Sequence, residues 1–330
     1  MEKSQINSPI LAIMELVNLV SVPMSLNAVI KLKVLDIISQ NGSNNPLSAA
    51  EILSAIAVGP AGDAENLQRI LRLLTSYGVF DEHIGNDGIF IDGGGKALAA
   101  DENGLSYAPY VLQHHQDALM LAWPRVHEAV LDSSSEPFVK VHGELPYSYY
   151  GKNPEMNLLM QKAMSGVSVP FMEAFLDRYD GFQGVETLVD VGGNSGDCLR
   201  LIMNKYQSIE HVGGDLLKSN IPPGDAIFMK WLLVTCTDDE SKHILKNCSD
   251  ALPSGGKLVI CDPLLPNHTD ESRRSRAILE ADIYIMTMYR TKGKHRTETE
   301  YRALGTAAGF TNLKANFKID HYFTVLEFEK

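Results

Sequence analysis

The sequence predicts a helical N-terminal region followed by a doubly wound α/β domain. The chain has 330 residues, which is more than one small core needs and enough for two domains. Apolar residues recur at helical spacing in the first part, and from Gly184 onward short apolar runs alternate with amphipathic helices. Strands that alternate with helices in this way form parallel sheets.

Helices account for the predicted N-terminal region. One apolar helix is expected over 10–22, which Pro23 breaks or kinks, and a second over 28–38. Residues 48–51 form a capping box that opens another helix, and 66–77 carry apolar residues on one face. Closely spaced short helices are typical of DNA-binding helix-turn-helix units, but the acidic charge of this chain favours a packing or dimerisation unit.

The charge and the cysteines exclude several classes of protein. The formal net charge is -12, and Arg273, Arg274 and Arg276 form the one short basic cluster, so nucleic acid and anionic membranes are poor partners. Four cysteines show no CxxC pairing and no histidine at metal-ligand spacing, which indicates neither a disulfide framework nor a metal site. The apolar N-terminal stretch contains Glu15 and Asn18 and follows no basic leader, so we expect a cytoplasmic protein without a membrane span.

The α/β domain begins with a strand over 188–191, a glycine-rich turn over 192–196 and a helix. Such a turn lets the backbone approach a ligand, although alone it has low specificity. In dinucleotide-binding domains an acidic residue about twenty positions later holds the ribose. Glu210 and Asp215 fall near that distance, but the stretch before them has little room for a second strand. Further expected elements are strands over 226–229 and 257–261, a helix over 240–252, and an antiparallel pair over 317–328 that turns near Asp320.

Five motifs carry a family resemblance that extends over nearly the whole chain. They are Leu188-Val189-Asp190-Val191-Gly192-Gly193, His211-Val212-Gly213-Gly214-Asp215, Asp225-Ala226-Ile227-Phe228-Met229-Lys230-Trp231, Lys246-Asn247-Cys248 with Ala251-Leu252-Pro253, and Arg296-Thr297-Glu298. Together they resemble the plant caffeate and flavonoid O-methyltransferases, which are class II small-molecule enzymes. The resemblance implies dimers that use S-adenosylmethionine and methylate a phenolic hydroxyl, with a histidine general base between two glutamates.

The resemblance also implies a fold and a division into domains. The expected fold is a Rossmann-like methyltransferase sheet, here incomplete, with an N-terminal all-α winged-helix-like dimerisation domain. Residues 1–110 are expected to form the helical dimerisation domain, 111–183 a helical linker and substrate-pocket region, and 184–330 the methyltransferase-like α/β domain. A homodimer is the expected assembly.

The cofactor site that the resemblance implies is altered in this sequence. Between Ile209 and His211 the family has an additional segment of about twenty residues, which holds the second strand and the ribose-binding aspartate. Asn194 stands where the family has a third glycine. The positions that match cofactor contacts in the family are Asp190, Gly192, Asp215 and Lys230. With the segment missing, these four are expected to be vestigial and no cofactor is expected to bind.

The catalytic residues of the family are replaced as well. Val234 stands where the family has its histidine base, and Val234 cannot accept a proton. Asp262 and His295 stand where the family has the two glutamates. The carboxylate of Asp262 could orient His295 and raise its basicity, so these two residues are the expected catalytic pair.

A substrate pocket is still expected on the resemblance. Adjacent residues on a helix point about 100° apart, so only one of the histidines 114 and 115 needs to face such a pocket. Methionine and aromatic stripes at helical spacing are more often plain core than pocket. The expected substrate-binding residues are His114, His115, Met164, Trp231, Val234, Tyr284 and Tyr289.

The altered site leads to one principal hypothesis and two alternatives about function. The principal hypothesis is an enzyme that isomerises or cyclises a hydroxycinnamate-like small phenolic, for example to a coumarin, by acid-base chemistry without S-adenosylmethionine. The first alternative keeps S-adenosylmethionine and methylates an oxygen or a nitrogen, since an amine needs less help from a base. The second alternative is a non-catalytic partner that dimerises with an intact paralogue.

Overall fold

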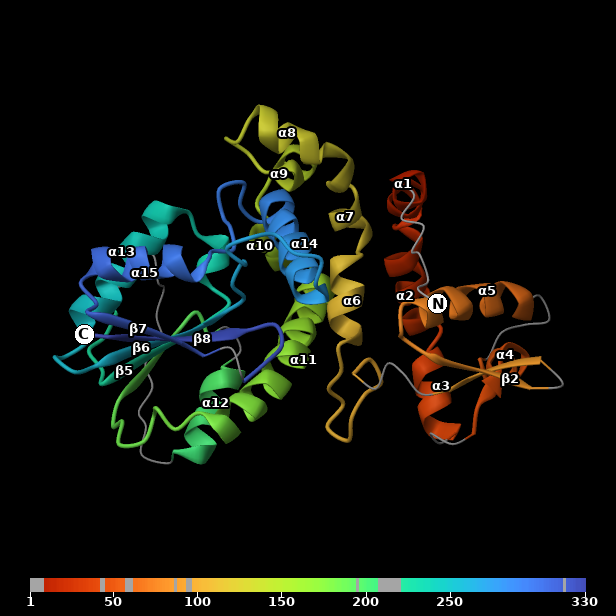
Figure 1. The fold of residues 1–330 in the computed structure, drawn as a ribbon, viewed down its shortest axis with the longest axis horizontal. Helices are drawn as coiled ribbons and strands as arrows, with labels where there is room; N and C mark the ends of the chain where they lie inside the picture. Colours follow the sequence, from red (N-terminus) through yellow and green to blue (C-terminus); the bar gives the residue numbers. More distant parts are fainter. Residues whose placement is uncertain are drawn as a thin grey trace, which may run out of the picture. The chain divides into compact units, whose positions relative to one another are not determined.

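The computed structural model describes residues 9–41, 45–56, 62–85, 88–92, 97–193, 196–206, 221–316 and 319–330 (Figure 1). The chain divides into two compact units. The N-terminal unit comprises the residues up to Gln116 together with Leu158–Val167, and the second unit comprises Asp117–Asn157 and Ser168–Lys330.

Helices and one small antiparallel sheet build the N-terminal unit. The sheet has the order β1-β3-β2, and β2 and β3 form a hairpin. Buried leucines of α5 pack with Val29, Ile52 and Phe80 in one apolar core. The elements are α1 (Pro9–Asn18), α2 (Ser21–Lys31), α3 (Val34–Asn41), β1 (Leu47–Ser48), α4 (Ala49–Ala55), α5 (Ala64–Ser76), β2 (Asp81–Gly85), β3 (Gly88–Asp92) and α6 (Ala108–His114). A hairpin beside short helices is the arrangement expected of a winged-helix-like domain.

Local sequence features explain where these helices begin and end. The hydroxyl of Ser48 accepts the amide of Glu51 and the carboxylate of Glu51 accepts the amide of Ser48, which confirms the predicted capping box. The single helix predicted over 28–38 is wrong, because Lys33 adopts a φ of 57° and separates α2 from α3. The break between α1 and α2 lies before Pro23 and not at it. Pro23 is in the first turn of α2, where its missing amide costs no hydrogen bond.

The first two helices present an apolar surface. Residues Pro9–Lys31 are long and apolar enough to cross a membrane by length and composition alone. Seven of their large apolar side chains are 58–72% exposed: Ile10, Leu11, Ile13, Met14, Leu16, Val17 and Val20. The described residues of the N-terminal unit therefore leave this face uncovered.

A five-stranded mixed sheet forms the centre of the second unit. Its order is β4-β5-β6-β8-β7. The strands β4, β5 and β6 are parallel to one another, and β8 is antiparallel to both of its neighbours, β6 and β7. Figure 1 shows α13 and α15 on one face of the sheet and α12 with the end of α11 on the other. The strands are β4 (Leu188–Val191), β5 (Ala226–Lys230), β6 (Lys257–Asp262), β7 (Asn312–Asn316) and β8 (Thr324–Glu329).

From β4 to β6 the helices of this unit alternate with strands as expected. The apolar face of α13 packs on Ile227, Met229, Leu258 and Ile260, which point to one side of the sheet. The helices are α7 (Asp117–Met120), α8 (Val126–Leu131), α9 (Pro137–His142), α10 (Pro146–Lys152), α11 (Pro154–Arg178), α12 (Asp197–Lys205), α13 (Asp238–Ala251), α14 (Arg273–Met288) and α15 (Glu298–Ala308). Single 3-10 turns lie at Trp123–Arg125 and Leu233–Thr235.

The C-terminal strands confirm an antiparallel edge on the sheet. Asp320 accepts the amides of Tyr322 and Phe323, both at 2.7 Å, and so forms the predicted turn. The first strand of the pair is β7, which precedes the predicted range, and Phe317 lies outside the described residues. At the opposite edge, no strand within the described residues pairs with the outer side of β4.

Candidate functional site

The carboxyl ends of β4, β5 and β6 meet at one edge of the sheet, where parallel α/β domains bind their ligands. Gly192 follows β4 with a φ of 81°, and a β-carbon there would lie 3.2 Å from the methyl carbons of Leu232. The turn after β4 therefore packs directly against the loop after β5. This contact places the glycine-rich turn and the position of the family's catalytic base in one site.

Asp190 and Gly193 form the part of the turn that fits a cofactor. A β-carbon on Gly193 would collide with Oδ2 of Asp190, so glycine lets the carboxylate keep its place. Among the described residues that oxygen has no hydrogen-bond partner, and burial raises the pKa of Asp190 to about 6. An unsatisfied buried acceptor beside a turn without side chains suits the ammonium group of an amino-acid-containing cofactor. Asn194 and Asp215 lie outside the described residues.

Lys230 ends β5, and aromatic rings enclose its ammonium group. The Nζ atom lies 4.4 Å from the ring centre of Phe323 and 5.1 Å from that of Trp231, and it donates to Oγ of Ser168 at 3.0 Å. Burial lowers the pKa of Lys230. These cation–π contacts stabilise the buried charge. The predicted contact of Lys230 with a cofactor stays a prediction.

Trp231 introduces a strained turn directly after β5. Its φ is 54°, a left-handed conformation that costs a non-glycine residue about 1–2 kcal/mol. Its amide donates to the carbonyl of Cys261 at 3.0 Å, and its ring meets Phe323 edge to face. Strain of this kind clusters at functional sites. The next residues form the 3-10 turn that carries Val234, whose side chain is buried.

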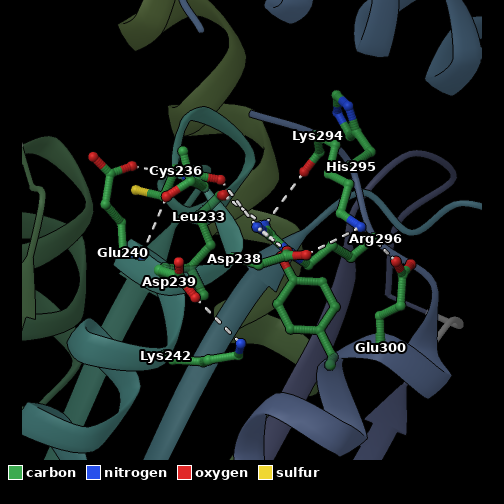
Figure 2. A network of polar contacts seen from close by, with 12 residues as sticks. Leu233, Cys236, Asp238, Asp239, Glu240, Lys242, Lys294, His295, Arg296 and Glu300 are labelled. Carbon is green, nitrogen blue, oxygen red and sulfur yellow. Dashed lines mark hydrogen bonds and ion pairs between the residues drawn. The ribbon is translucent and has the colours of Figure 1, made fainter. Parts of the chain in front are cut away.

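Hydrogen bonds of Arg296 connect this turn to the segment that precedes α15. Its guanidinium donates to the carbonyls of Leu233 at 2.8 Å and Cys236 at 2.9 Å, and to the carboxylate of Asp238 at 2.9 Å (Figure 2). Partial burial acts to raise the pKa of Asp238, but Arg296 and Lys294 together outweigh it and the pKa lies below its usual value. The side chain of Arg296 is completely buried, so the shape of the Val234 turn depends on these bonds.

His295 precedes this arginine and is also completely buried. Its amide donates to Oδ1 of Asp282 on α14 at 2.6 Å, and its Nδ1 lies 3.3 Å from the same oxygen. The Nε2 atom is buried and has no hydrogen-bond partner in the part of the chain that the structure describes. The structure therefore gives His295 a carboxylate partner, but that partner is Asp282.

Asp262 ends β6 and bonds to a different element. Its Oδ2 accepts the hydroxyl of Tyr301 on α15 at 2.5 Å, and its Oδ1 is buried with no hydrogen-bond partner among the described residues. Burial raises the pKa of Asp262 to about 6, against the opposing effects of Tyr301 and of nearby cations. The predicted pair of His295 with Asp262 is thus wrong as a hydrogen bond, because Tyr301 and Asp282 hold the two side chains separately.

Aromatic residues from several helices of the second unit pack around the end of α14. Tyr289 contacts Tyr284 with ring centres 5.8 Å apart and Tyr147 at 5.3 Å, and its hydroxyl lies 3.4 Å from that of Tyr150. Burial raises the pKa of Tyr289 well above its usual value, so the phenol stays protonated. Trp123 extends the group, with its ring centre 6.3 Å from that of Tyr284. The two tyrosines predicted from the sequence thus belong to a larger aromatic cluster.

His114, His115 and Met164 belong to the N-terminal unit. The Nδ1 atoms of the two histidines lie 3.0 Å and 2.8 Å from the carbonyls four residues earlier, of Tyr110 and Val111. Burial lowers the pKa of His114 to about 4, so its imidazole is neutral at pH 7. The predicted role of all three residues in substrate binding stays a prediction.

Sequence reasoning missed several residues that shape the site. Asp282 lies on α14, thirteen positions before His295, and no local pattern connects the two. Tyr147, Tyr150 and Trp123 come from helices far away in the sequence. Arg296 was part of a recognised motif, but only its buried bonds to the Val234 turn reveal what it does.

Comparisons with known proteins place the chain in a family. The model of the O-methyltransferase domain matches residues 123–210 and 203–311, and that of the O-methyltransferase dimerisation domain matches 14–94. Two relatives are both named nicotinate N-methyltransferase 1: the protein of Glycine max is 59% identical, and that of Arabidopsis thaliana 55%, each over 97% of this chain and 96% of the relative. The chain belongs to the plant class II O-methyltransferase family with a dimerisation domain.

The fold agrees with this family. Human N-acetylserotonin methyltransferase, solved in complex with S-adenosylmethionine, superposes with a TM-score of 0.79 and 17% identity, over 100% of this chain and 99% of that one. The expected methyltransferase-like α/β fold with an N-terminal helical dimerisation domain is confirmed.

The relatives correct the principal functional hypothesis. Proteins more than half identical to this chain over nearly its whole length are named methyltransferases, so the expectation of an isomerase or cyclase that works without S-adenosylmethionine is wrong. The expected lack of a cofactor and of methyl transfer is wrong for the same reason. The error lay in treating loss of the base as loss of the reaction, although a base is needed only where the acceptor carries a proton.

Proposed function

We propose that this chain is an S-adenosylmethionine-dependent N-methyltransferase that methylates the ring nitrogen of nicotinate or a similar pyridine carboxylate. The observation that carries the proposal is Val234, a buried side chain without a titratable group at the position of the family's base. The names of the soybean and Arabidopsis relatives support the same acceptor.

The chemistry of a pyridine acceptor explains why the site needs no base. The ring nitrogen of nicotinate carries a lone pair and no proton at neutral pH, so nothing has to be removed before it attacks. S-adenosylmethionine supplies the methyl group: a carbon–nitrogen bond forms, a carbon–sulfur bond breaks, and the positive charge passes from sulfur to the ring. The remaining task of the protein is to orient the acceptor and exclude water.

Residues of the glycine-rich turn would hold the cofactor. Oδ2 of Asp190, which has no hydrogen-bond partner within the described residues, would accept its ammonium group, and Gly192 and Gly193 leave room for close approach of the backbone. We also propose that the segment of about twenty residues found in the family between the equivalents of Ile209 and His211 is absent from this chain. Two observations support this: the domain match falls into two pieces that overlap at 203–210, and the soybean alignment spans 343 positions although it uses only 97% of 330 residues.

Methyl transfer to a panel of acceptors tests the proposal. Purified protein is incubated with labelled S-adenosylmethionine and either nicotinate, nicotinamide or caffeate, and the products are identified by mass spectrometry. The proposal expects a methyl group on the nitrogen of nicotinate and none on caffeate. Methylation of caffeate together with an inert nicotinate would contradict it.

Restoring the family's histidine tests the role of Val234. We expect Val234→His to give no appreciable methylation of caffeate, because Asp262 is bonded to Tyr301 and His295 cannot replace the second glutamate. Since Val234 is 1% exposed, the larger ring should also lower the free energy of unfolding by about 1–3 kcal/mol. Val130→His, at an 81% exposed position, is the control and should change neither property. Caffeate turnover by Val234→His near the wild-type rate on nicotinate would refute this account.

The N-terminal helices support a homodimer as part of the proposal. A protomer that exposes the apolar residues of α1 needs a partner for them, and the dimerisation family matches from residue 14. Light scattering should give about twice the 36.3 kDa of one chain. Val17→Asp, at a 72% exposed position, should shift the protein toward monomer, whereas Ile84→Asp, 83% exposed on β2, should not. A wild-type monomer at micromolar concentration would disprove the dimer.

The domain boundaries 1–110, 111–183 and 184–330 and the cytoplasmic location remain parts of this proposal. The acidic charge of the chain supports the absence of nucleic-acid and anionic-membrane partners.

A further inference from the structure

His295 stands out among the basic side chains around the Val234 turn. Lys294 is paired with Glu300 at 2.8 Å, Arg290 with Glu240, and Arg296 with Asp238 and three carbonyls. Within the described part of the chain, Nε2 of His295 is a buried nitrogen that has no hydrogen-bond partner. Leaving such an atom unsatisfied is costly, so it points to a ligand.

The segment that carries His295 contacts the Val234 turn both before and after His295 in the sequence. A β-carbon on Gly293 would lie 2.9 Å from the carbonyl oxygen of Val234, and Arg296 bonds to the carbonyl of Leu233. His295 lies between these two contacts in the sequence. Figure 2 shows its imidazole directed away from the Arg296 guanidinium, so the ring is not part of that buried network.

Asp282 determines which nitrogen of His295 can serve a ligand. Its Oδ1 receives the backbone amide and lies within reach of Nδ1, so a ring proton on Nδ1 is directed to Asp282. In the imidazolium form Nε2 is a second donor, and Asp282 balances its charge. In that form the arrangement leaves one buried N–H, on Nε2, available for an anion.

We propose that Nε2 of His295 donates to the carboxylate of the pyridine substrate and thereby selects an anionic acceptor. The inference rests on the proposed function, in which the acceptor is a pyridine carboxylate. A buried carboxylate needs a charged donor, and the family's glutamate at this position would repel it. The change from glutamate to histidine thus replaces a negative group by a group that can be positive, next to the turn where the base was lost.

The test compares two acceptors that differ in charge but hardly in shape. KM and kcat are measured for nicotinate and nicotinamide with the wild type, His295→Ala and His295→Glu. For nicotinate, His295→Ala should raise KM roughly 10- to 100-fold with little change in kcat, since one charge-assisted hydrogen bond is lost. KM for nicotinamide should change far less, and His295→Glu should disfavour nicotinate further.

Two more variants separate recognition from structural damage. Asp282→Asn keeps the shape but removes the balancing charge, and should raise KM for nicotinate less than His295→Ala does. His243→Ala removes an exposed histidine of α13 and should change nothing. Equal losses with both acceptors, or an unchanged KM for nicotinate in His295→Ala, would overturn the inference while leaving N-methylation intact. A wild-type enzyme that does not methylate nicotinate would overturn the proposed function itself.

Discussion

Arg296→Ala is expected to lower the free energy of unfolding by about 3–5 kcal/mol, the largest loss of stability from one side chain of the site. The guanidinium is completely buried and bonds to Leu233, Cys236 and Asp238. Without it, buried carbonyl groups lose their donor and cannot reach water. Denaturant unfolding monitored by circular dichroism measures the change.

A neighbouring cation provides the control for this variant. Lys242 pairs with Asp239 on α13, but the two side chains are 55% and 95% exposed, so Lys242→Ala should cost about 0.5 kcal/mol or less (Figure 2). Arg296→Lys should fall between the two, because an ammonium group keeps the charge but lacks the planar fork. If Arg296→Ala cost less than about 1 kcal/mol, the turn that carries Val234 would not depend on these bonds.

Asp190→Asn is expected to stabilise the protein without its cofactor while weakening cofactor binding by about 10- to 100-fold or more. Burial raises the pKa of Asp190 from 3.8 to about 6 in the folded state, so between these pH values the folded protein binds more protons than the unfolded chain. The free energy of unfolding therefore falls as pH rises through this window. The fall is about 3 kcal/mol for a pKa difference of about two units, and the free energy of unfolding stays lower above pH 6. Asparagine removes this pH dependence.

Two measurements on the same preparation check this prediction. Unfolding free energies between pH 4 and 8 should fall less steeply for Asp190→Asn than for the wild type, and calorimetric titration should show the weaker binding of S-adenosylmethionine. Asp239→Asn, at a 95% exposed carboxylate, should leave both properties unchanged. A variant that binds S-adenosylmethionine as tightly as the wild type would remove Asp190 from the cofactor site.

The functional prediction failed for a chemical reason. It rested on two inferences: Val234 stands in place of the family's base, and an acidic residue is missing from the cofactor site, which remains a proposal. They led to a reaction without methyl transfer because a phenol was assumed as the acceptor. A nitrogen with a free lone pair needs no base, which is why the alternative of N-methylation agrees better with the relatives.

The sequence alone determined many of the elements and the family, because both depend on local patterns. The short apolar runs of β4, β5 and β6, the capping box at Ser48 and the glycines after β4 each act within a few residues. Only the tertiary structure decided the partners of the site. Three of these partners come from elements separate from the residue they contact: Asp282 beside His295, Tyr301 bonded to Asp262, and the aromatic rings around Lys230. Such pairs form only when the packing of helices on the sheet brings distant side chains together and removes them from water, which no local pattern records.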